Sequence, residues 1–409
     1  MRTIDTVVIG AGHAGLAVSH SLTDRAIEHV VVERGRIGER WRSARWDSFR
    51  LLTPNWLARL PGWTYTGGDP DGFMDAPQFV GYLQEYAAAF DAPVLSGTTV
   101  LEVRAAGDRY VITTDRGGWT AANVVIATGY HARARVPPYA TGIAADIAQV
   151  TLDRYRGPAR LPDGAVLVVG ASASGVQIAD DLVRAGRRVA LAVGGHTRLP
   201  RTYRGRDILW WLDRTGSLDR TVDDMVDPDS AQWETSLQLA GTGRAVDLGA
   251  LQDRGVRLAG RLLGVEANRA HFADDLAETT TAADARLRGV LARLDRRAVA
   301  LGVDGPGQPI PAVTPTRGPT HLDLRRAGVA AVVWATGFRP WYPWLAVPVL
   351  DRDGLLQHRR GVTAAPGLYA IGLKFQYRRR STFIDGVRED AAYLVDHIAA
   401  RCPRRTVGS

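Results

Sequence analysis

The sequence predicts an α/β fold with two Rossmann-like dinucleotide-binding domains, one of them inserted into the other. Three observations predict it. Short apolar runs bounded by glycine, such as DTVVIG, HVVVER and AVLVVG, recur along the chain, as expected of a parallel sheet that is covered on both faces. A glycine-cornered turn from strand to helix occurs twice, at 7–18 and 168–179. An apolar strand that ends in Ala-Thr-Gly also occurs twice, at 124–131 and 333–340.

Helices are expected between several of these strands. Their ranges are 13–24, 77–90, 174–185, 276–301 and 384–400. The order of the repeats suggests three segments. Residues 1–158 form the first part of the outer domain, residues 159–325 form the inserted domain, and residues 326–409 return to complete the outer domain.

Composition bounds the class of protein. The chain has 409 residues, of which 45% are apolar and 23% charged, as in ordinary globular proteins. No apolar run approaches the roughly 18 residues of a membrane span, and the sequence passes from MRTID directly into a strand without a leader. We therefore expect a cytoplasmic protein without a membrane partner.

Charge and cysteine usage exclude further classes. The net charge is +8, and Lys374 is the only lysine among the 51 basic residues. The arginines are spread among 43 acidic residues, so no nucleic-acid partner is expected. Cys402 is the only cysteine, which excludes internal disulfides and a Cys-x-x-Cys redox pair. The nine histidines form no ligand pattern, and no metal site is expected.

The two glycine-rich turns align residue by residue at an offset of 160. Each turn would let backbone N–H groups and the positive end of a helix approach a pyrophosphate. Ser172 replaces a glycine and keeps a small side chain, and Ala173 and Ser174 open the second helix. The aligned residues are Gly10, Gly12 and Gly15 in the first turn and Gly170, Ser172 and Gly175 in the second.

The residue that follows the second strand of each unit indicates the nucleotide. Glu33 lies 18 residues beyond Gly15, where a carboxylate accepts hydrogen bonds from both ribose hydroxyls of FAD or NAD(H). The same count from Gly175 reaches Val193, without an acid. His196, Arg198 and Arg201 follow, and arginine binds a 2′-phosphate in a bidentate manner, so the second turn is assigned to NADP(H). A solvated basic loop is the alternative.

One chain that holds FAD and NADPH implies hydride transfer from nicotinamide to flavin. The electrons then need an acceptor. Because the sequence lacks a cysteine pair, the acceptor is oxygen, a small molecule or a partner protein.

The chain resembles the flavin-containing monooxygenase-like flavoproteins, the class B group, over nearly its whole length. The resemblance rests on GAGHAG, Glu33, the segment GERWRSARWDSFRLLTPNW (38–56), both Ala-Thr-Gly elements, GASASG, GLYAIGL and STFIDG. It implies FAD and NADPH as cofactors. It also implies a monooxygenase that acts through a flavin C4a-(hydro)peroxide, with molecular oxygen and a small organic substrate, as a monomer or homodimer. The oxidised atom, whether nitrogen, sulfur, carbon or the carbon next to a ketone, stays open.

The resemblance also implies roles for individual residues. The segment 38–56 would wrap the flavin, with Arg40 and Asn55 as catalytic candidates and Trp41 and Thr53 beside them. Asn55 is the candidate donor near the flavin C4a edge, with a helix cap as the alternative. Trp46 is expected to be a core anchor. The other cofactor contacts implied are Arg34, Val100, Thr128, Gly129, Thr336, Gly337 and Phe383.

The family fingerprint F-x-G-x-x-x-H does not match. If Tyr155 closes it, Ala145, Ile147 and Thr151 take the Phe, Gly and His positions, so Thr151 becomes the candidate for the catalytic histidine's place. This mismatch favours, as an alternative, an NADPH-dependent flavin dehydrogenase or oxidase that inserts no oxygen. A third hypothesis is a cofactor-binding sensor that uses the helix 276–301 as an interface.

Overall fold

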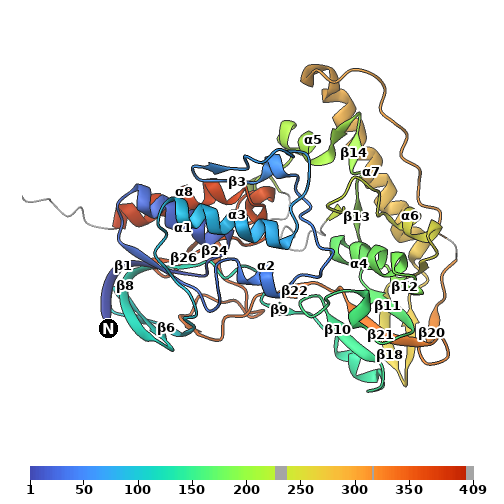
Figure 1. Cartoon of the computed structure of the whole chain (residues 1–409), viewed down its shortest axis with the longest axis horizontal. Coiled ribbons are helices and arrows are strands. Elements are labelled where there is room, and N and C mark those ends of the chain that lie inside the picture. Colours follow the sequence, from blue (N-terminus) through green and yellow to red (C-terminus); the bar gives the residue numbers. More distant parts are fainter. Residues whose placement is uncertain (226–236, 316, 402–409) are drawn as a thin grey trace, which may run out of the picture.

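The computed structural model of the protein describes residues 1–225, 237–315 and 317–401. These residues form a mixed α/β fold with two lobes that lie side by side (Figure 1). We call the lobe with the ten-stranded sheet the first unit and the lobe with the five-stranded sheet the second unit. The mixed α/β class expected from the sequence is confirmed. Cys402 lies outside the described residues.

The sheet of the first unit combines parallel strands with an antiparallel meander. Strand β1 pairs in parallel with β2 on one side and with β8 on the other, and β26 joins β8 in parallel. The strands β6, β7 and β8 form the meander. The members are β23 (Leu345–Ala346), β6 (Val100–Ala106), β7 (Arg109–Thr114), β8 (Gly117–Ile126), β1 (Arg2–Ile9), β2 (His29–Val32), β5 (Val94–Leu95), β24 (His358–Arg359), β25 (Val362–Thr363) and β26 (Leu368–Ala370).

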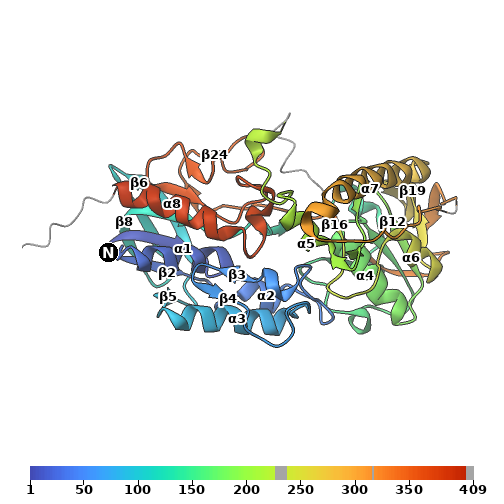
Figure 2. The ribbon, with the colours of Figure 1, turned by 90° about the horizontal axis from the view of Figure 1, so that it is seen from above.

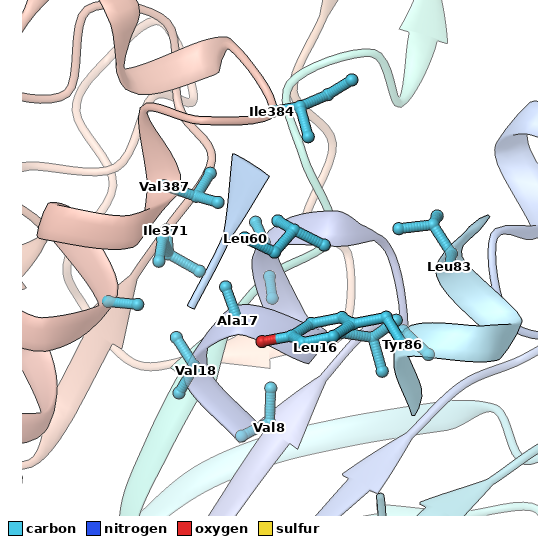
Figure 3. Close-up of a cluster of buried hydrophobic side chains, with 14 of the residues drawn as sticks. Val8, Leu16, Ala17, Val18, Leu60, Leu83, Tyr86, Ile371, Ile384 and Val387 are labelled. Atoms are coloured by element: carbon cyan, nitrogen blue, oxygen red, sulfur yellow. The ribbon is translucent and has the colours of Figure 1, made fainter. Parts of the chain in front are cut away.

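Three helices cover one face of this sheet. Figure 3 shows Leu16 of the first helix near Val8 of β1, with Val387 of the last helix in the same buried cluster. Val7 and Ile9 point to the opposite face and join a second cluster. Because both faces are covered, β1 is apolar at consecutive positions. The helices are α1 (His13–Asp24), α3 (Ala76–Ala89) and α8 (Val387–Arg401), and Figure 2 shows them from above.

The second unit contains a fully parallel sheet. Its strands follow the order β10, β21, β11, β12 and β17. The helices α4 (Ala173–Arg184) and α6 (Leu248–Asp253) contribute to the apolar cluster on one face, and a small antiparallel sheet contributes to the cluster on the other. The bounds are β10 (Ala148–Thr151), β21 (Val329–Trp334), β11 (Ala165–Val169), β12 (Val189–Ala192), β17 (Arg257–Ala259), and, in the small sheet, β18 (Leu262–Glu266), β19 (Arg269–Phe272) and β20 (His321–Asp323).

The second sheet extends beyond the range 159–325 that the sequence suggested for the inserted domain. Strands β10 and β21 fall outside that range, yet β21 lies between β10 and β11. The physical reason is internal symmetry, because β21 pairs with β11 as β8 pairs with β1, and Ala-Thr-Gly directly follows both strands. The chain passes between the units through a ribbon of β9 (Arg133–Ala134) and β22 (Phe338–Arg339). Figure 1 shows this ribbon between the two lobes.

The expected helices are present within three residues of their predicted bounds. The range 276–301 corresponds to α7 (Leu276–Ala298) and a short 3₁₀ turn. The range 384–400 begins later, at Val387, because Asp385 is occupied by ion pairs and Gly386 packs against the carbonyl of Arg380. On α7, Leu287 and Leu294 are buried against the second unit, which supports packing rather than an interface role for this face. The remaining helices are α2 (Glu39–Ser43) and α5 (Ile208–Arg214).

Side-chain contacts also join the units. The Arg380 guanidinium contacts Asp213 and Asp219 of the second unit at 2.7 and 2.8 Å and Asp385 of the first at 2.7 Å. Ser48 donates to Asp181 at 2.8 Å. The remaining short strands form three ribbons, β3 (Arg59–Leu60) with β4 (Trp63–Thr64), β13 (Thr197–Arg198) with β16 (Leu237–Gln238), and β14 (Thr202–Tyr203) with β15 (Arg206–Asp207).

The second glycine turn generates a stability prediction. A Cβ at Gly175 would lie 1.8 Å from the carbonyl oxygen of Gly170, so Gly175→Ala must push helix and strand apart. We expect a loss of about 3 kcal/mol in the free energy of unfolding, measured by urea denaturation. Gly81→Ala is the control, because a Cβ there meets open space on α3 and should stabilise by about 0.5 kcal/mol. Equal stability of the two variants would contradict the packing described for the turn.

Candidate nucleotide sites

The first glycine turn is shaped by two close approaches and one open position. Gly10 has φ +110°, and a Cβ there would lie 2.7 Å from the carbonyl oxygen of Ala127. A Cβ at Gly15 would lie 1.9 Å from the carbonyl oxygen of Gly10. A Cβ at Gly12 would meet nothing within 4 Å. Gly10 and Gly15 are thus required by packing, whereas Gly12 leaves room beside the start of α1 for a ligand.

The second turn repeats this geometry. Gly170 has φ +106°, and a Cβ there would lie 2.5 Å from the carbonyl oxygen of Ala335. Ser172 is the N-cap residue of α4, as Gly12 is of α1, and its side chain makes no capping hydrogen bond. Ala173 and Ser174 open the helix. The backbone N–H groups at this helix start therefore keep the orientation that binds an anion.

The two Ala-Thr-Gly elements pack against the two turns. Ala127 approaches Gly10 as Ala335 approaches Gly170, which explains the sequence repeat. Gly129 and Gly337 both have positive φ, at +70° and +84°. The Thr336 hydroxyl donates to the carbonyl of Arg135, whereas Thr128 is exposed. The expected residues Thr128, Gly129, Thr336 and Gly337 thus lie at the carboxyl edge of each sheet, beside the glycine turns.

Glu33, the carboxylate expected at the ribose, lies beside the first turn. It is buried after β2, and its two oxygens accept N–H hydrogen bonds from Ala11 and Gly35, both at 2.9 Å. These bonds fix the carboxylate beside the first turn, and each oxygen keeps a lone pair for a hydroxyl. Arg34 is exposed next to it. Val100 opens β6 two residues after Thr98, whose N–H donates to the Glu33 carbonyl at 2.9 Å.

Val193 occupies the matching place in the second unit. Its N–H donates to the Ala259 carbonyl at 2.9 Å, as the Glu33 N–H donates to the Leu95 carbonyl at 3.0 Å. The side chain is fully buried. The alignment that counted from Gly175 is therefore correct in space, and this edge of the second sheet carries an apolar residue where the first carries a carboxylate.

The basic residues that follow have partners within the protein. Arg198 is 3% exposed, pairs with Asp284 and with Asp247 at 2.7 Å, and donates to the Pro311 carbonyl at 3.1 Å. A guanidinium neutralised by two carboxylates is committed to the fold and is poorly placed to attract a phosphate. It ties the segment after β12 to α7 through Asp284.

Arg201 and His196 are also committed to the protein. Arg201 is buried, binds Asp207 through Nε at 2.8 Å and donates to the Leu52 carbonyl at 2.8 Å. His196 is 1% exposed, and its Nδ1 lies 3.0 Å from the Gly194 carbonyl oxygen. Burial lowers its pKa, so the ring is neutral near pH 7. Neither residue presents a free cation to a 2′-phosphate.

The segment 38–56 begins on the first turn and runs to the second unit. The Gly38 N–H donates to the Ala11 carbonyl at 3.0 Å, which positions α2 beside the glycines. Arg40 donates to the His131 carbonyl and lies 5.8 Å from the Phe338 ring, so it contacts the residues that follow both Ala-Thr-Gly elements. Trp41 packs edge-on against Phe79 at 4.8 Å.

Trp46 and Thr53, also in this segment, differ in burial. Trp46 is buried in the apolar cluster of the second unit, near Tyr155, and is a core anchor as expected. Thr53 is half-buried two residues before Asn55.

Asn55 is used by the backbone. It is 5% exposed, its Nδ2 donates to the Asp69 carbonyl at 2.8 Å, and its Oδ1 accepts the Met74 N–H at 2.9 Å. The amide therefore fixes the loop 69–74. This differs from the expected donor to a flavin oxygen, and it also differs from a helix cap, because Asn55 is the first residue of a 3₁₀ turn capped by Pro54.

Thr151 and Phe383 also make contacts with other parts of the protein. Thr151 ends β10 opposite Trp334, and its carbonyl accepts the N–H groups of Arg154 and Tyr155, both at 2.9 Å. Phe383 is half-buried against the cluster that joins the units, which includes Leu57. The structure thus gives Thr151 a turn-forming role and brings no histidine to its position.

A cationic cluster that the sequence patterns did not predict lies near the first turn. Burial holds the pKa of His131 well below its ordinary value, and so do the charges of four groups from three parts of the chain, Arg45, Arg40, His13 and Lys374. Burial lowers the pKa of His13 to about 4 and that of Arg45 to about 10. At pH 7 both histidines are neutral and Arg45 is charged.

This cluster suits an anionic ligand. The Arg45 guanidinium lies over the ring of Trp41 at 4.5 Å and over that of Phe49 at 5.2 Å, so aromatic faces hold it in place. One signal could have identified this cluster, since His13 directly follows Gly12 and His131 directly follows the first Ala-Thr-Gly-Tyr.

Among the described residues, no group of three His, Cys, Asp or Glu side chains is arranged for a metal, and no helix is long and apolar enough to cross a membrane.

Comparisons with known proteins agree with this geometry. A family model described as pyridine nucleotide-disulphide oxidoreductase matches residues 7–205. A relative from Geobacillus kaustophilus, described as an uncharacterized oxidoreductase CzcO-like, is 32% identical over 97% of this chain and 98% of its own. The solved flavin-containing monooxygenase from Stenotrophomonas maltophilia has a TM-score of 0.69 at 20% identity and covers 98% of this chain and 100% of its own. The OTEMO complex with FAD and NADP has a TM-score of 0.55 at 16% identity, over 97% and 85%.

The relatives define an oxidoreductase enzyme, and the chain shares the fold of solved flavin-containing monooxygenases, so the resemblance found in the sequence is confirmed for the fold and the oxidoreductase class. Within that class the chain belongs to the CzcO-like oxidoreductases.

The burial of Arg198 generates a prediction. Arg198→Ala leaves Asp247 and Asp284 without their cation, and we expect a loss of about 3 kcal/mol in the free energy of unfolding. Urea denaturation measures it, with the exposed Arg257→Ala as a control that changes stability by less than about 0.5 kcal/mol. If Arg198→Ala were as stable as the wild type and lost only its affinity for NADP⁺, the phosphate role expected from the sequence would be restored.

Proposed function

We propose that the two units are Rossmann-like nucleotide domains, that the first binds FAD and the second NADPH, and that the protein is an NADPH-dependent flavoprotein monooxygenase of a small organic substrate. The observation that carries the proposal is the pair of equivalent glycine turns at the parallel strands of two sheets, with a fixed carboxylate after the second strand of one unit and none at the matching place in the other. A relative in fold that was solved with FAD and NADP supports it.

The first unit fits FAD. The open position at Gly12 and the start of α1 would take the pyrophosphate, and Glu33 would accept the ribose hydroxyls. The cationic cluster of Arg40, Arg45 and Lys374 around His131 would face negative charge that develops on the ring system. His131 stays neutral there, so it can share a hydrogen bond without adding charge.

The second unit fits NADPH rather than a second FAD. The turn at Gly170 and Ser172 would take its pyrophosphate. A carboxylate at position 193 would repel a 2′-phosphate, and the buried Val193 removes this repulsion. The β9–β22 ribbon and the segment 43–59 hold the two units together, which hydride transfer between the two cofactors requires.

Bound flavin supplies the two-electron chemistry with nicotinamide and oxygen. The chain's own residues hold the cofactors, position the two units and exclude water. Trp41 and Phe79 pack edge to face beside Arg45, so one side of the cationic cluster is apolar. A site of this kind protects reactive species from hydrolysis and stray protons.

A second candidate function is an NADPH-dependent flavin dehydrogenase or oxidase without oxygen insertion. Thr151 favours it, because β10 ends in a turn-forming threonine where the family fingerprint has a histidine. The cofactors and the hydride transfer are the same in both candidates, so they differ only in the fate of the electrons.

One experiment separates the two. The purified FAD protein is reduced with NADPH without oxygen and then mixed with oxygen, while the flavin spectrum and hydrogen peroxide are followed. A monooxygenase should reoxidise slowly through a spectrum that is neither oxidised nor reduced flavin. Immediate reoxidation with one peroxide per NADPH would support the oxidase. Absence of reduction by NADPH would contradict both candidates.

A further inference from the structure

The internal symmetry of the two units identifies a position beside the proposed NADPH ribose. In the first unit β5 lies next to β2, and the residue two places after β5, Gly97, donates its N–H to the Gly35 carbonyl at 2.8 Å. In the second unit β17 lies next to β12 with Ala259 opposite Ala192. The residue two places after β17 is Arg261. It therefore occurs at the same carboxyl edge as Val193.

The Arg261 side chain lies over the loop that follows β12. A Cβ built on Gly194 would lie 3.8 Å from Arg261 Nε, so the side chain extends above Gly194, directly after Val193. The backbone of Arg261 is fixed, since its N–H donates to Asp275 Oδ1 at 3.1 Å and its carbonyl accepts the Ala273 N–H at 2.9 Å. The side chain itself is exposed.

Arg261 differs in its charge balance from Arg198 and Arg201, the arginines that follow β12. Arg198 and Arg201 are buried with aspartates, and Arg286 of α7 donates to the His196 carbonyl at 2.8 Å. Across the described residues, the Arg261 guanidinium forms no ion pair with a carboxylate. The backbone at Gly195 is open as well, because a Cβ there would meet nothing within 4 Å. A cation thus lies over Gly194, next to the open position at Gly195.

We propose that Arg261 is the residue that recognises the 2′-phosphate of NADPH and so sets the preference for NADPH over NADH. This inference rests on the proposed function of the second unit. A guanidinium on a fixed backbone binds a phosphate dianion through charge-assisted, bidentate hydrogen bonds. Arg261 follows β17, about 60 residues beyond the loop that follows β12. Because Val193 is not an acid, no negative charge at that position repels the phosphate.

The test measures binding of NADP⁺ and NAD⁺ to the FAD-loaded protein by calorimetry, since neither nucleotide reduces flavin. Arg261→Ala should raise the Kd of NADP⁺ roughly tenfold to a hundredfold and leave that of NAD⁺ within about twofold. Arg261→Lys should recover part of the loss. Arg257→Ala, at the other end of β17, removes the same charge and should leave both affinities unchanged.

The outcomes are distinguishable. If the wild type prefers NADP⁺ and Arg261→Ala keeps that preference, the inference is wrong and the proposed function stands. If the wild type binds NAD⁺ as tightly as NADP⁺, or binds neither, both the inference and the proposed cofactor are wrong. Equal loss in Arg261→Ala and Arg257→Ala would indicate only general electrostatic attraction and would also overturn the inference.

Discussion

The contact between a positive-φ glycine and an alanine carbonyl is the constraint on which both candidate nucleotide sites depend. Gly10 and Gly170 pack at 2.7 and 2.5 Å, measured from the Cβ that each lacks, against Ala127 and Ala335. Any side chain at either glycine would displace the Ala-Thr-Gly strand and with it the start of the following helix. The same strand–turn–helix arrangement, packed against an Ala-Thr-Gly element, therefore occurs once in each sheet.

Residues of the first unit that reach the second unit determine how these sites are joined. The chain leaves α2 at Ser43, places Trp46 in the core of the second unit, and returns to Arg59 in the first. Arg40 contacts the residues after both Ala-Thr-Gly elements, and Arg380 binds aspartates of both units. The relation between the proposed flavin and nicotinamide positions therefore rests on packed and ionic contacts as well as on the β9–β22 ribbon.

Features with a local cause could be predicted from the sequence. The turns at Gly10 and Gly170 and the position of Glu33 depend on nearby residues and a fixed strand–turn–helix spacing. The role of Arg198 could not be predicted, because its partners Asp247 and Asp284 are 49 and 86 residues away. The use of Asn55 by the loop 69–74 could not be predicted either, because this loop also lies further along the chain. The sequence predicts β21 in the outer domain, because it does not show which of the two Ala-Thr-Gly strands pairs with which glycine turn.

The central claim is that one chain holds two different dinucleotides in two copies of one turn. Calorimetric titration of the flavin-saturated protein with NADP⁺ tests it most directly, together with spectroscopic measurement of the bound flavin. The account predicts one FAD and one NADP⁺ per chain, bound at the same time, with the flavin retained throughout. Displacement of FAD by NADP⁺, or a second FAD per chain in place of NADP⁺, would contradict it.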